Sequence, residues 1–433
     1  MKKMLKAAAV LAAMVMALTL GACDNGSSSG SGGGNGNTPN DHDTPKNPFG
    51  FTEEDNFDYF CLDKDGKVLQ KVNYPDEGED VEGTVFLVYW KILTDGSMGE
   101  VELYEYYGDY EDVTIPDGVT EIGYYVFQGC SSLESVNIPG SVTTIGSYAF
   151  QGCSSLESVN IPDGVTAIGS SAFQGCSSLA SVNIPDGVTI IGDYAFQGCS
   201  SLASVNIPGS VTTIGDSAFQ GCSSLESVNI HDGVTTIGSS AFSGCSSLES
   251  VTIPGSVTTI DQYTFKGCSS LESVTIPDSV TEIGFSAFSG CSSLASVTIP
   301  DGVTEIGDYA FQGCSSLASV TIPGSVTAIG SSAFQGCSSL ASVNIHDGVT
   351  TIGSSAFKDC TSLASVTIPD GVTRISWHAF SGCSSLASVT FAVTDGWVCS
   401  SRYIDVTDAE TNATNLKTDG NAWEANGLDR YTN

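Results

Sequence analysis

The residues of this 433-residue chain with the most varied possible chemistry are its fifteen cysteines, which could bind metal, form disulfides or act as nucleophiles. Twelve of them recur every 23 residues from Cys130 to Cys383, and only Cys23, Cys61 and Cys399 lie outside that series. Zinc sites need cysteines in close pairs, which these single residues do not form. Equivalent residues on stacked units lie about 4.7–4.9 Å apart, beyond the roughly 3.8 Å mean Cβ separation of a disulfide. The spacing therefore predicts reduced thiols that act as small apolar core residues.

The four histidines and the many serines offer little catalytic chemistry. His231 and His346 lie in identical stretches 115 residues apart, which block duplication explains better than a shared metal site. His42 precedes the repeats, and His378 is expected on a loop of the last full repeat. Serines such as Ser154 have no adjacent base, and neither a phosphate-binding loop nor a zinc-protease motif is present. We predict no catalytic residue, no cofactor and no enzymatic activity.

Acidic residues dominate the charge: 49 Asp and Glu against 14 Lys and Arg give a net charge of −35. Such a field repels nucleic acid and anionic membrane surfaces, so nucleic-acid binding is excluded. Glu226, Glu249 and Glu272 occupy one repeat position. We interpret them as solvated carboxylates, with a weak calcium or basic-partner site as the alternative. Asp63–Gly66 resembles a calcium loop but lacks the downstream carboxylates, so a tight turn is predicted and no metal ligand is assigned.

A 23-residue repeat must position these side chains. One unit, residues 297–319, reads VTIPDGVTEIGDYAFQGCSSLAS, and equivalent units run from Val113 to Phe391. Phenylalanine recurs without exception from Phe127 to Phe380. In the unit that begins at Cys130, the apolar positions are Cys130, Leu133, Val136, Ile138, Val142, Ile145, Ala149 and Phe150.

The spacing within a unit predicts two short extended sides. Ser135–Ile138 alternates outward and inward side chains, as a strand with one buried face does. Pro139 has no N–H to donate and ends this strand. Val142 and Ile145 are expected to pack a second side, after which Gly146 permits a tight bend. Ala149 and Phe150 then fill the interior. Because no unit can bury its apolar face alone, the units must stack.

The fold class predicted is a β-rich solenoid of about twelve 23-residue coils over residues 113–391. Residues 49–112 carry strand-like runs and are expected to form a small β-rich N-terminal cap. Residues 392–433 are expected to form a short C-terminal cap packed by Trp397, Tyr403 and Trp423.

The first residues predict export. Basic residues, an apolar run from Ala7 to Leu20 and small residues end at Cys23, a pattern typical of a signal peptide over residues 1–22. The sequence Leu20-Gly-Ala-Cys23 resembles the lipobox of bacterial lipoproteins, which implies lipid attachment at Cys23; an ordinary signal peptide is the alternative. Residues 23–48 are rich in Gly, Ser and Asn and are interpreted as a flexible tether. The lipid would be the only link to a membrane.

The pattern C-x-x-L-x-x-V-x-I-P-x-x-V-x-x-I-G-x-x-A-F-x-x-C, repeated through residues 113–391, resembles the BspA-like class of leucine-rich repeats. The resemblance implies a curved solenoid in which the Val136-x-Ile138 strands form one parallel sheet. It also implies exposure on a bacterial surface and, for some members, adhesion to host matrix proteins or to other bacteria. Ligands differ widely within this class, so none is carried over.

The outward residue of each first strand is the candidate binding position. A host-matrix or bacterial-surface protein or glycan is the expected partner, bound by an adhesin-like, lipid-anchored protein of the cell envelope. A structural spacer or coat component without a specific ligand is the alternative, and an enzyme hidden in the end segments is the weakest hypothesis. The candidate binding residues are Asn137, Asn160, Asn183, Asn206, Asn229, Thr252, Thr275, Thr298, Thr321 and Asn344.

Overall fold

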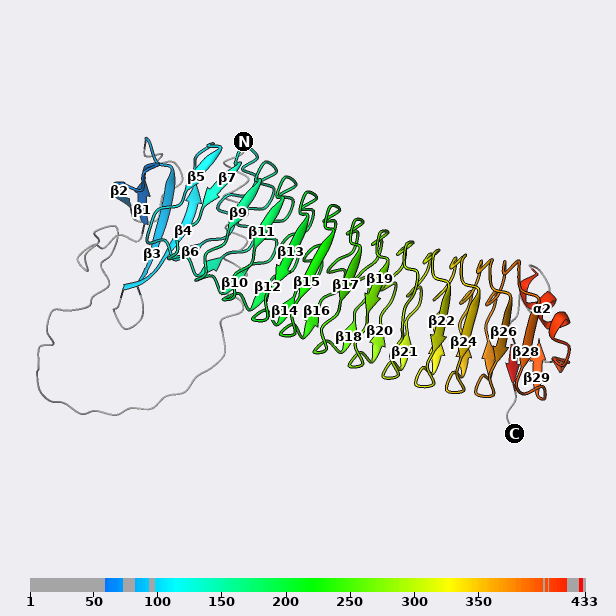
Figure 1. Cartoon of the computed structure of the whole chain (residues 1–433). Coiled ribbons are helices and arrows are strands. Elements are labelled where there is room, and N and C mark those ends of the chain that lie inside the picture. The colour runs from blue at the N-terminus through cyan, green and yellow to red at the C-terminus, as the bar shows by residue number, and fades with distance from the viewer. Residues whose placement is uncertain are drawn as a thin grey trace, which may run out of the picture. The chain divides into compact units, whose positions relative to one another are not determined.

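The computed structural model describes residues 59–72, 82–92, 98–399, 402–403, 405–418 and 428–430. The chain divides into two compact units, residues 1–46 and 47–433, and every described residue belongs to the second. The expected signal peptide, Cys23 and nearly all of the tether lie in the first unit, outside the described residues. The second unit is a β-solenoid of about 13 turns, close to the twelve coils expected (Figure 1).

The first row of strands follows the Ser-Val-Asn and Ser-Val-Thr segments. Consecutive strands pair in parallel with a register of 23 residues, for example Val205 with Val228. The strands are β5 (Asp112–Thr114), β7 (Ser135–Asn137), β9 (Ser158–Asn160), β11 (Ser181–Asn183), β13 (Ser204–Ile207), β15 (Ser227–Ile230), β17 (Ser250–Thr252), β19 (Ser273–Thr275), β22 (Ser319–Ile322), β24 (Ser342–Ile345), β26 (Ser365–Ile368) and β28 (Ser388–Phe391).

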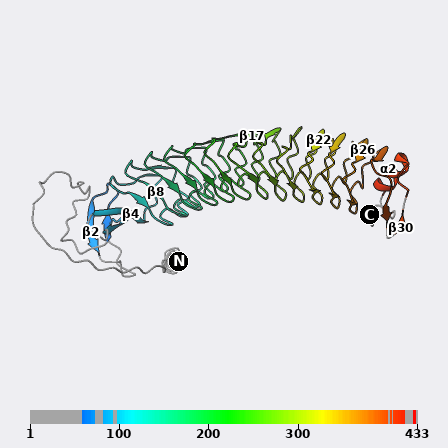
Figure 2. The same cartoon turned by 90° about the horizontal axis from the view of Figure 1, so that it is seen from below.

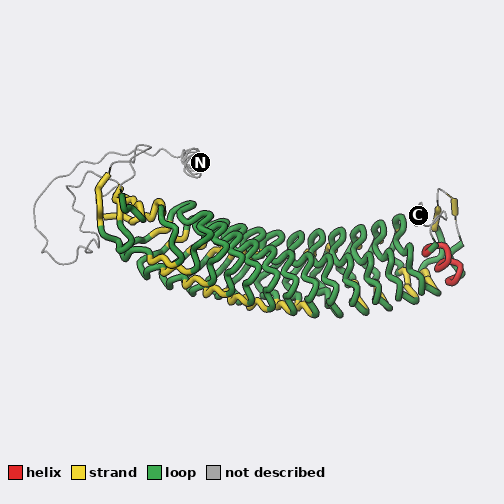
Figure 3. Tube along the Cα trace, turned by 90° about the horizontal axis from the view of Figure 1, so that it is seen from above, coloured by secondary structure: helices red, strands yellow, loops and turns green. Residues whose placement is uncertain are grey.

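This first row is two sheets rather than the single sheet that the resemblance implied. Eight strands from β5 to β19 form one sheet, and β22, β24, β26 and β28 form another. In the coil between them, Ser296 makes a single bridge to Ser273, and the described residues of that coil contain no strand of the first row. The solenoid is curved, and the strands of the first row follow the outer side of the curve (Figures 2 and 3).

The second row consists of two-residue strands that end in the buried isoleucine, as expected from Val142 and Ile145. Each pairs in parallel with the equivalent pair of the next coil, for example Ile168 with Ile191. The strands are β6 (Glu121–Ile122), β8 (Thr144–Ile145), β10 (Ala167–Ile168), β12 (Ile190–Ile191), β14 (Thr213–Ile214), β16 (Thr236–Ile237), β18 (Thr259–Ile260), β20 (Glu282–Ile283), β21 (Glu305–Ile306), β23 (Ala328–Ile329), β25 (Thr351–Ile352) and β27 (Arg374–Ile375).

Phenylalanines form a continuous column through the core. The twelve rings from Phe127 to Phe380 are fully buried. Neighbouring rings stack with centroids 4.9–5.6 Å apart and interplanar angles of 2–10°. Each ring between the two ends of the column therefore packs against the rings of the coils on both sides, which ties the stability of a coil to that of its neighbours.

The glycine after the second strand has a different role from the bend expected at Gly146. A Cβ placed on Gly330 would lie 2.5 Å from the carbonyl carbon of Gly307 in the preceding coil. Glycine is required here because the coils approach closely. The sharp change of direction comes two residues later, where Tyr, Ser or His adopts a left-handed conformation in every coil with φ of 53–63°.

Asp261 interrupts this glycine column, and the second row is interrupted at the same coil. The sheet that contains β6 ends at β16, and the next begins at β18. In neighbouring coils the glycine N–H donates to an isoleucine carbonyl 24 residues earlier, as from Gly238 to Ile214 at 2.8 Å. Among the described backbone bonds none links Asp261 to Ile237. A side chain at this close approach accounts for the break, although the smaller Ser376 keeps its bond to Ile352 at 2.8 Å.

The N-terminal end of the array is covered by antiparallel strands. Their order is β2 (Val68–Val72), β1 (Tyr59–Leu62), β3 (Phe86–Ile92) and β4 (Met98–Tyr106), and β4 then pairs in parallel with β6. The ring of Tyr106 lies 4.8 Å from that of Phe127, and Phe86 lies 5.7 Å from Tyr106. These strands thereby extend both the second row and the aromatic column.

The C-terminal end is covered by a helix that the sequence reading did not predict, α2 (Ala409–Lys417), which packs against β28. The Asn412 amide donates to the carbonyl of Val389 at 3.1 Å, and Lys417 donates to Leu386 at 2.6 Å. The helix therefore satisfies backbone groups at the last edge of the first row.

Three short strands complete this end: β29 (Trp397–Cys399), β30 (Arg402–Tyr403) and β31 (Leu428–Arg430). The last of these pairs antiparallel with both β27 and β29. Trp397 is buried and meets Phe391 edge to face at 4.9 Å, as expected of a residue that packs the cap. The side chain of Tyr403 and the whole of Trp423 lie outside the described part of the chain.

Candidate functional site

The outward residues of the first row, which we call the ribbon, are exposed in every coil. Each stands between two residues that point into the core, so that Asn206 is exposed while Val205 and Ile207 are buried. This alternation is the direct result of a strand with one buried face. The ribbon contains Asn137, Asn160, Asn183, Asn206, Asn229, Thr252, Thr275, Thr298, Thr321, Asn344, Thr367 and Thr390.

Amides and hydroxyls are the only polar groups that the ribbon side chains carry, so the row is uncharged but can donate and accept hydrogen bonds. Neighbouring amides also meet across coils: Asn229 Nδ2 donates to Asn206 Oδ1 at 2.8 Å. Such a row offers one hydrogen-bonding position per coil to a partner lying across the strands. The structure thus brings the ten candidate residues onto one surface.

The two duplicated histidines lie beside the ribbon, where most coils have proline. Both are exposed, and His231 Nε2 lies 2.9 Å from Asn229 Nδ2 and 3.1 Å from Asn206 Oδ1. His346 Nε2 lies 3.2 Å from Asn344 Nδ2. His378, in contrast, occupies the left-handed loop position, with φ of 58°. The histidines therefore extend the polar surface and are not gathered in one place.

The repeat cysteines carry thiols rather than disulfides, and all but the first are buried in the core, as their spacing predicted. Those from Cys153 to Cys383 are buried, whereas Cys130 in the first complete unit is partly exposed. Each buried thiol donates to the carbonyl of the phenylalanine 26 residues earlier, as from Cys222 to Phe196 at 3.2 Å. That carbonyl also accepts the N–H of Cys199 at 3.1 Å. Cysteine therefore fills a small apolar space and uses its weak donor between coils.

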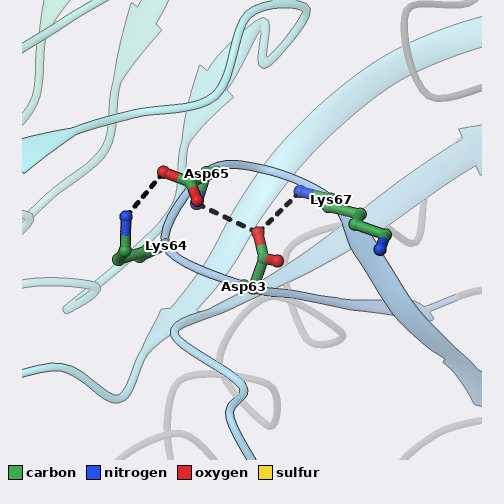
Figure 4. A network of polar contacts seen from close by, with 4 residues as sticks. All are labelled: Asp63, Lys64, Asp65 and Lys67. Carbon is green, nitrogen blue, oxygen red and sulfur yellow. Dashed lines mark hydrogen bonds and ion pairs between the residues drawn. The ribbon is translucent and has the colours of Figure 1, made fainter.

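The acidic residues considered as cation ligands do not converge. The described residues contain no group of three or more His, Cys, Asp or Glu side chains that could hold a metal ion. The Asp63 carboxylate accepts the backbone N–H groups of Asp65 at 3.0 Å and Lys67 at 2.9 Å, and Lys64 pairs with Asp65 at 2.8 Å (Figure 4). Gly66 has φ of 78°. This segment is the predicted tight turn, and it joins β1 to β2.

Comparison with protein families decides the identity of the array. The model of the BspA type leucine rich repeat region matches residues 100–225, 166–295 and 281–395, with six copies. The chain belongs to the BspA-type leucine-rich repeat family. The resemblance seen in the repeat pattern is thereby confirmed, as is the leucine-rich-repeat solenoid.

Solved structures similar to this BspA-type chain include proteins from two bacteria. A leucine-rich repeat protein from Bacteroides ovatus is 34% identical, with a TM-score of 0.58, and the match covers 70% of this chain and 86% of that one. A leucine rich cell surface protein from Faecalibacterium prausnitzii is 29% identical, with a TM-score of 0.47, covering 75% and 96%. No curated protein sequence matches the chain significantly.

A second polar row in this BspA-type array was not anticipated from the sequence. Half-buried glutamines in the first complete coils form an amide ladder in which each Nε2 donates to the next Oε1, beginning at 2.5 Å between Gln128 and Gln151. The ladder continues through Gln174, Gln197 and Gln220. The signal available was the Gln-Gly-Cys triplet at a constant period. Its hydrogen bonds join coils, so the ladder is structural.

No helix among the described residues has the length and apolar character needed to cross a bilayer. The lipid attachment expected at Cys23 lies outside the part of the chain that the structure describes.

The thiol column predicts that the BspA-type array loses stability in alkali. Burial raises the pKa of Cys222, Cys268, Cys337 and Cys383 from an ordinary value of 9.0 to about 12. Unfolded thiols release their protons first, so this contribution is complete below about pH 9 and is lost between about pH 9 and 12. Urea unfolding at intervals of pH across that range measures the loss.

The matched control removes two titrating groups. Replacing Cys222 and Cys268 together with alanine should make the free energy of unfolding depend less steeply on pH above about 9. A parent whose stability stays constant to about pH 11 would show that these thiols are not buried in solution.

Proposed function

We propose that this chain is a lipid-anchored protein of the bacterial cell surface that holds protein or glycan partners along the ribbon. The observation that carries the proposal is the uncharged polar row, which is exposed in every coil. Its side chains are not part of the buried core, so they are available to a partner. Membership of the BspA-type family supports a binding role rather than catalysis. The adhesin-like activity rests on these two points.

Weak contacts that are repeated along the ribbon can together give a high overall affinity for a partner. Equivalent ribbon residues recur at each coil, so a partner that spans several coils engages several similar sites at once. Linked sites raise overall affinity by factors of about 10²–10⁴ when geometry allows simultaneous engagement. The near identity of the coils therefore suits an extended or multivalent partner.

The proposal is tested by placing positive charge on the ribbon. Asn160→Arg, Asn183→Arg and Asn206→Arg, introduced together, should abolish most capture of surface components from host-matrix and bacterial extracts without altering the unfolding transition. These side chains are exposed, so the expected change in stability is within about 0.5 kcal/mol. Quantitative pull-down with the parent and the variant gives the measurement.

The control adds the same charge to the second row of the same coils. Ala167, Ile190 and Thr213 hold the outward position at which a later coil has Arg374, so arginine fits there. The serine turns are less suitable, because the hydroxyls of Ser177 and Ser200 each donate to the preceding coil at 3.3 and 3.2 Å. If the second-row variant loses the partner and the ribbon variant keeps it, the assignment of the binding face to the ribbon is wrong.

Lipid anchoring is the other part of the proposal and is tested at Cys23. Cys23→Ser should abolish acylation and move the protein from the detergent phase to the aqueous phase on phase separation, because each buried acyl methylene contributes about 0.8 kcal/mol to membrane binding. A Cys23→Ser variant that remains as firmly membrane-bound as the parent would refute the lipobox interpretation.

A spacer or coat component is the second candidate function, and the uniformity of the outward residues favours it. Specific binding surfaces usually vary from coil to coil, whereas every ribbon position holds either Asn or Thr. If neither arginine variant changes any surface interaction, the spacer function replaces the adhesin-like one.

A further inference from the structure

Exposed aromatic residues of the coils lie on a surface distinct from the ribbon. In residues 113–391 the large hydrophobic side chains that remain exposed are Tyr124, Ile190, Tyr194, Phe285 and Trp377. The four aromatic ones all stand on the loop that follows the second row, at the left-handed position or at the residue before it. Sister coils have serine at both of these positions, so the coil geometry does not require aromatic rings there.

Three rings on consecutive coils form the best-developed cluster. Tyr263 and Tyr309 occupy the left-handed position with φ of 58° and 59°, and Phe285 stands between them beside the small Ser286. The Phe285 ring lies 5.2 Å from Tyr263 and 5.3 Å from Tyr309, tilted by 72° and 61°. Phe285 is 38% exposed. A bulky residue in this backbone region is uncommon, so serine would suit the fold at least as well.

We propose that Tyr263, Phe285 and Tyr309 form a stacking site for an uncharged, linear polysaccharide. The apolar C–H face of a sugar ring packs on an aromatic face while its hydroxyl groups remain hydrated or bonded to nearby polar side chains. Aromatic residues recur on the same loop surface in other coils, which suits a ligand that is itself long and repetitive. This site goes beyond the ribbon and does not depend on it.

The charges around the cluster favour a neutral ligand. The chain has a net charge of −35, which opposes acidic polysaccharides and nucleic acid. A cationic peptide is also disfavoured, because the Lys266 ammonium already lies 5.0 Å from the Tyr263 ring centroid and repels another cation. The two neighbouring carboxylates accept backbone N–H groups: Asp261 from Gln262 at 2.6 Å, and Asp308 from Ser331 at 2.5 Å.

The test uses the detergent-solubilised full chain in native gels that contain hydroxyethylcellulose, neutral arabinoxylan, galactomannan or dextran. At least one of these should retard the parent. Changing Tyr263, Phe285 and Tyr309 together to serine, the residue of sister coils, should raise the polysaccharide concentration needed for half-retardation by tenfold or more. Phe285→Ser alone should raise it severalfold, which keeps the test valid if the triple variant does not fold.

Two controls isolate the cluster. Ile190→Thr removes an exposed apolar residue that is not aromatic and should leave retardation unchanged. The ribbon variant Asn160→Arg/Asn183→Arg/Asn206→Arg should also bind the polysaccharide normally, so failure of the ribbon and failure of this site are distinguishable. Absence of retardation by all four polysaccharides, retardation that survives both serine variants, or binding only to poly-L-lysine would overturn the proposal.

Discussion

Replacing Phe219 with alanine is expected to lower the free energy of unfolding of the surrounding coils by about 3–5 kcal/mol. The ring is fully buried between Phe196 at 5.3 Å and Phe242 at 5.4 Å. Alanine would remove apolar contacts on both sides and leave a cavity that the rigid stack cannot close. Hydrogen exchange across neighbouring coils, together with urea unfolding, measures the local and total losses.

Tyr194→Ser is the matched control for this prediction. Tyr194 is 42% exposed and occupies a loop position at which sister coils have serine. The expected change is within about 0.5 kcal/mol, because no core contact is lost. Equal destabilisation by the two substitutions would mean that the phenylalanine column does not support the array.

Deleting one whole coil should be tolerated far better than deleting half of one. Excision of Cys222–Gly244 joins Gly221 to Cys245, the same Gly-Cys junction as in the parent, and brings Phe219 next to Phe265 in the column. The solenoid loses one unit and one interface, and its remaining coils keep their register. The shortened protein should remain monomeric, with the same circular-dichroism spectrum per residue.

Excision of only eleven residues, Cys222–Asp232, should have the larger effect. It removes one complete first-row strand, β15 (Ser227–Ile230), and leaves the next second-row strand and phenylalanine out of step. Adjacent coils then place unlike residues together, so core and ladder are both disrupted at this point. We expect aggregation, or a split into separate unfolding transitions on either side. Equal tolerance of the two deletions is incompatible with stacked, interchangeable coils.

Much of the fold was predictable because the same pattern of apolar core residues recurs in every repeat of the sequence. Alternation in Ser135–Ile138 predicted the first row, and the constant period of phenylalanine and cysteine predicted their burial. Val142 and Ile145 likewise indicated a second side. These features depend on local spacing, which a sequence displays directly.

Contacts between coils were harder to predict. Gly146 was expected to permit a tight bend, whereas its column is needed because a Cβ there would lie 2.7 Å from the carbonyl oxygen of Ile122 in the preceding coil. The left-handed loop residues are Tyr, Ser and His, so no glycine marked them. Helix α2 was missed although Asp408 is a favourable N-cap, whose carboxylate accepts the Thr411 N–H at 2.6 Å. Its apolar content is low, and tertiary contacts with β28 stabilise it.

The candidate site was predictable in position but not in ligand. Exposure of Asn206 follows from the burial of Val205 and Ile207, which the alternation gives. The aromatic cluster was not anticipated, because Tyr263, Phe285 and Tyr309 occupy two different repeat positions. Only the folded loops bring these three rings together.

The central claim is that binding is shared among equivalent ribbon residues, and its most direct test varies the number of coils. Parent and in-register deletions of one and three coils are compared for binding to the same immobilised surface component, by biolayer interferometry. Shared binding predicts an apparent affinity that falls stepwise as coils are removed, whichever coils are chosen. Complete loss on removal of one particular coil, or no dependence on coil number, would contradict it.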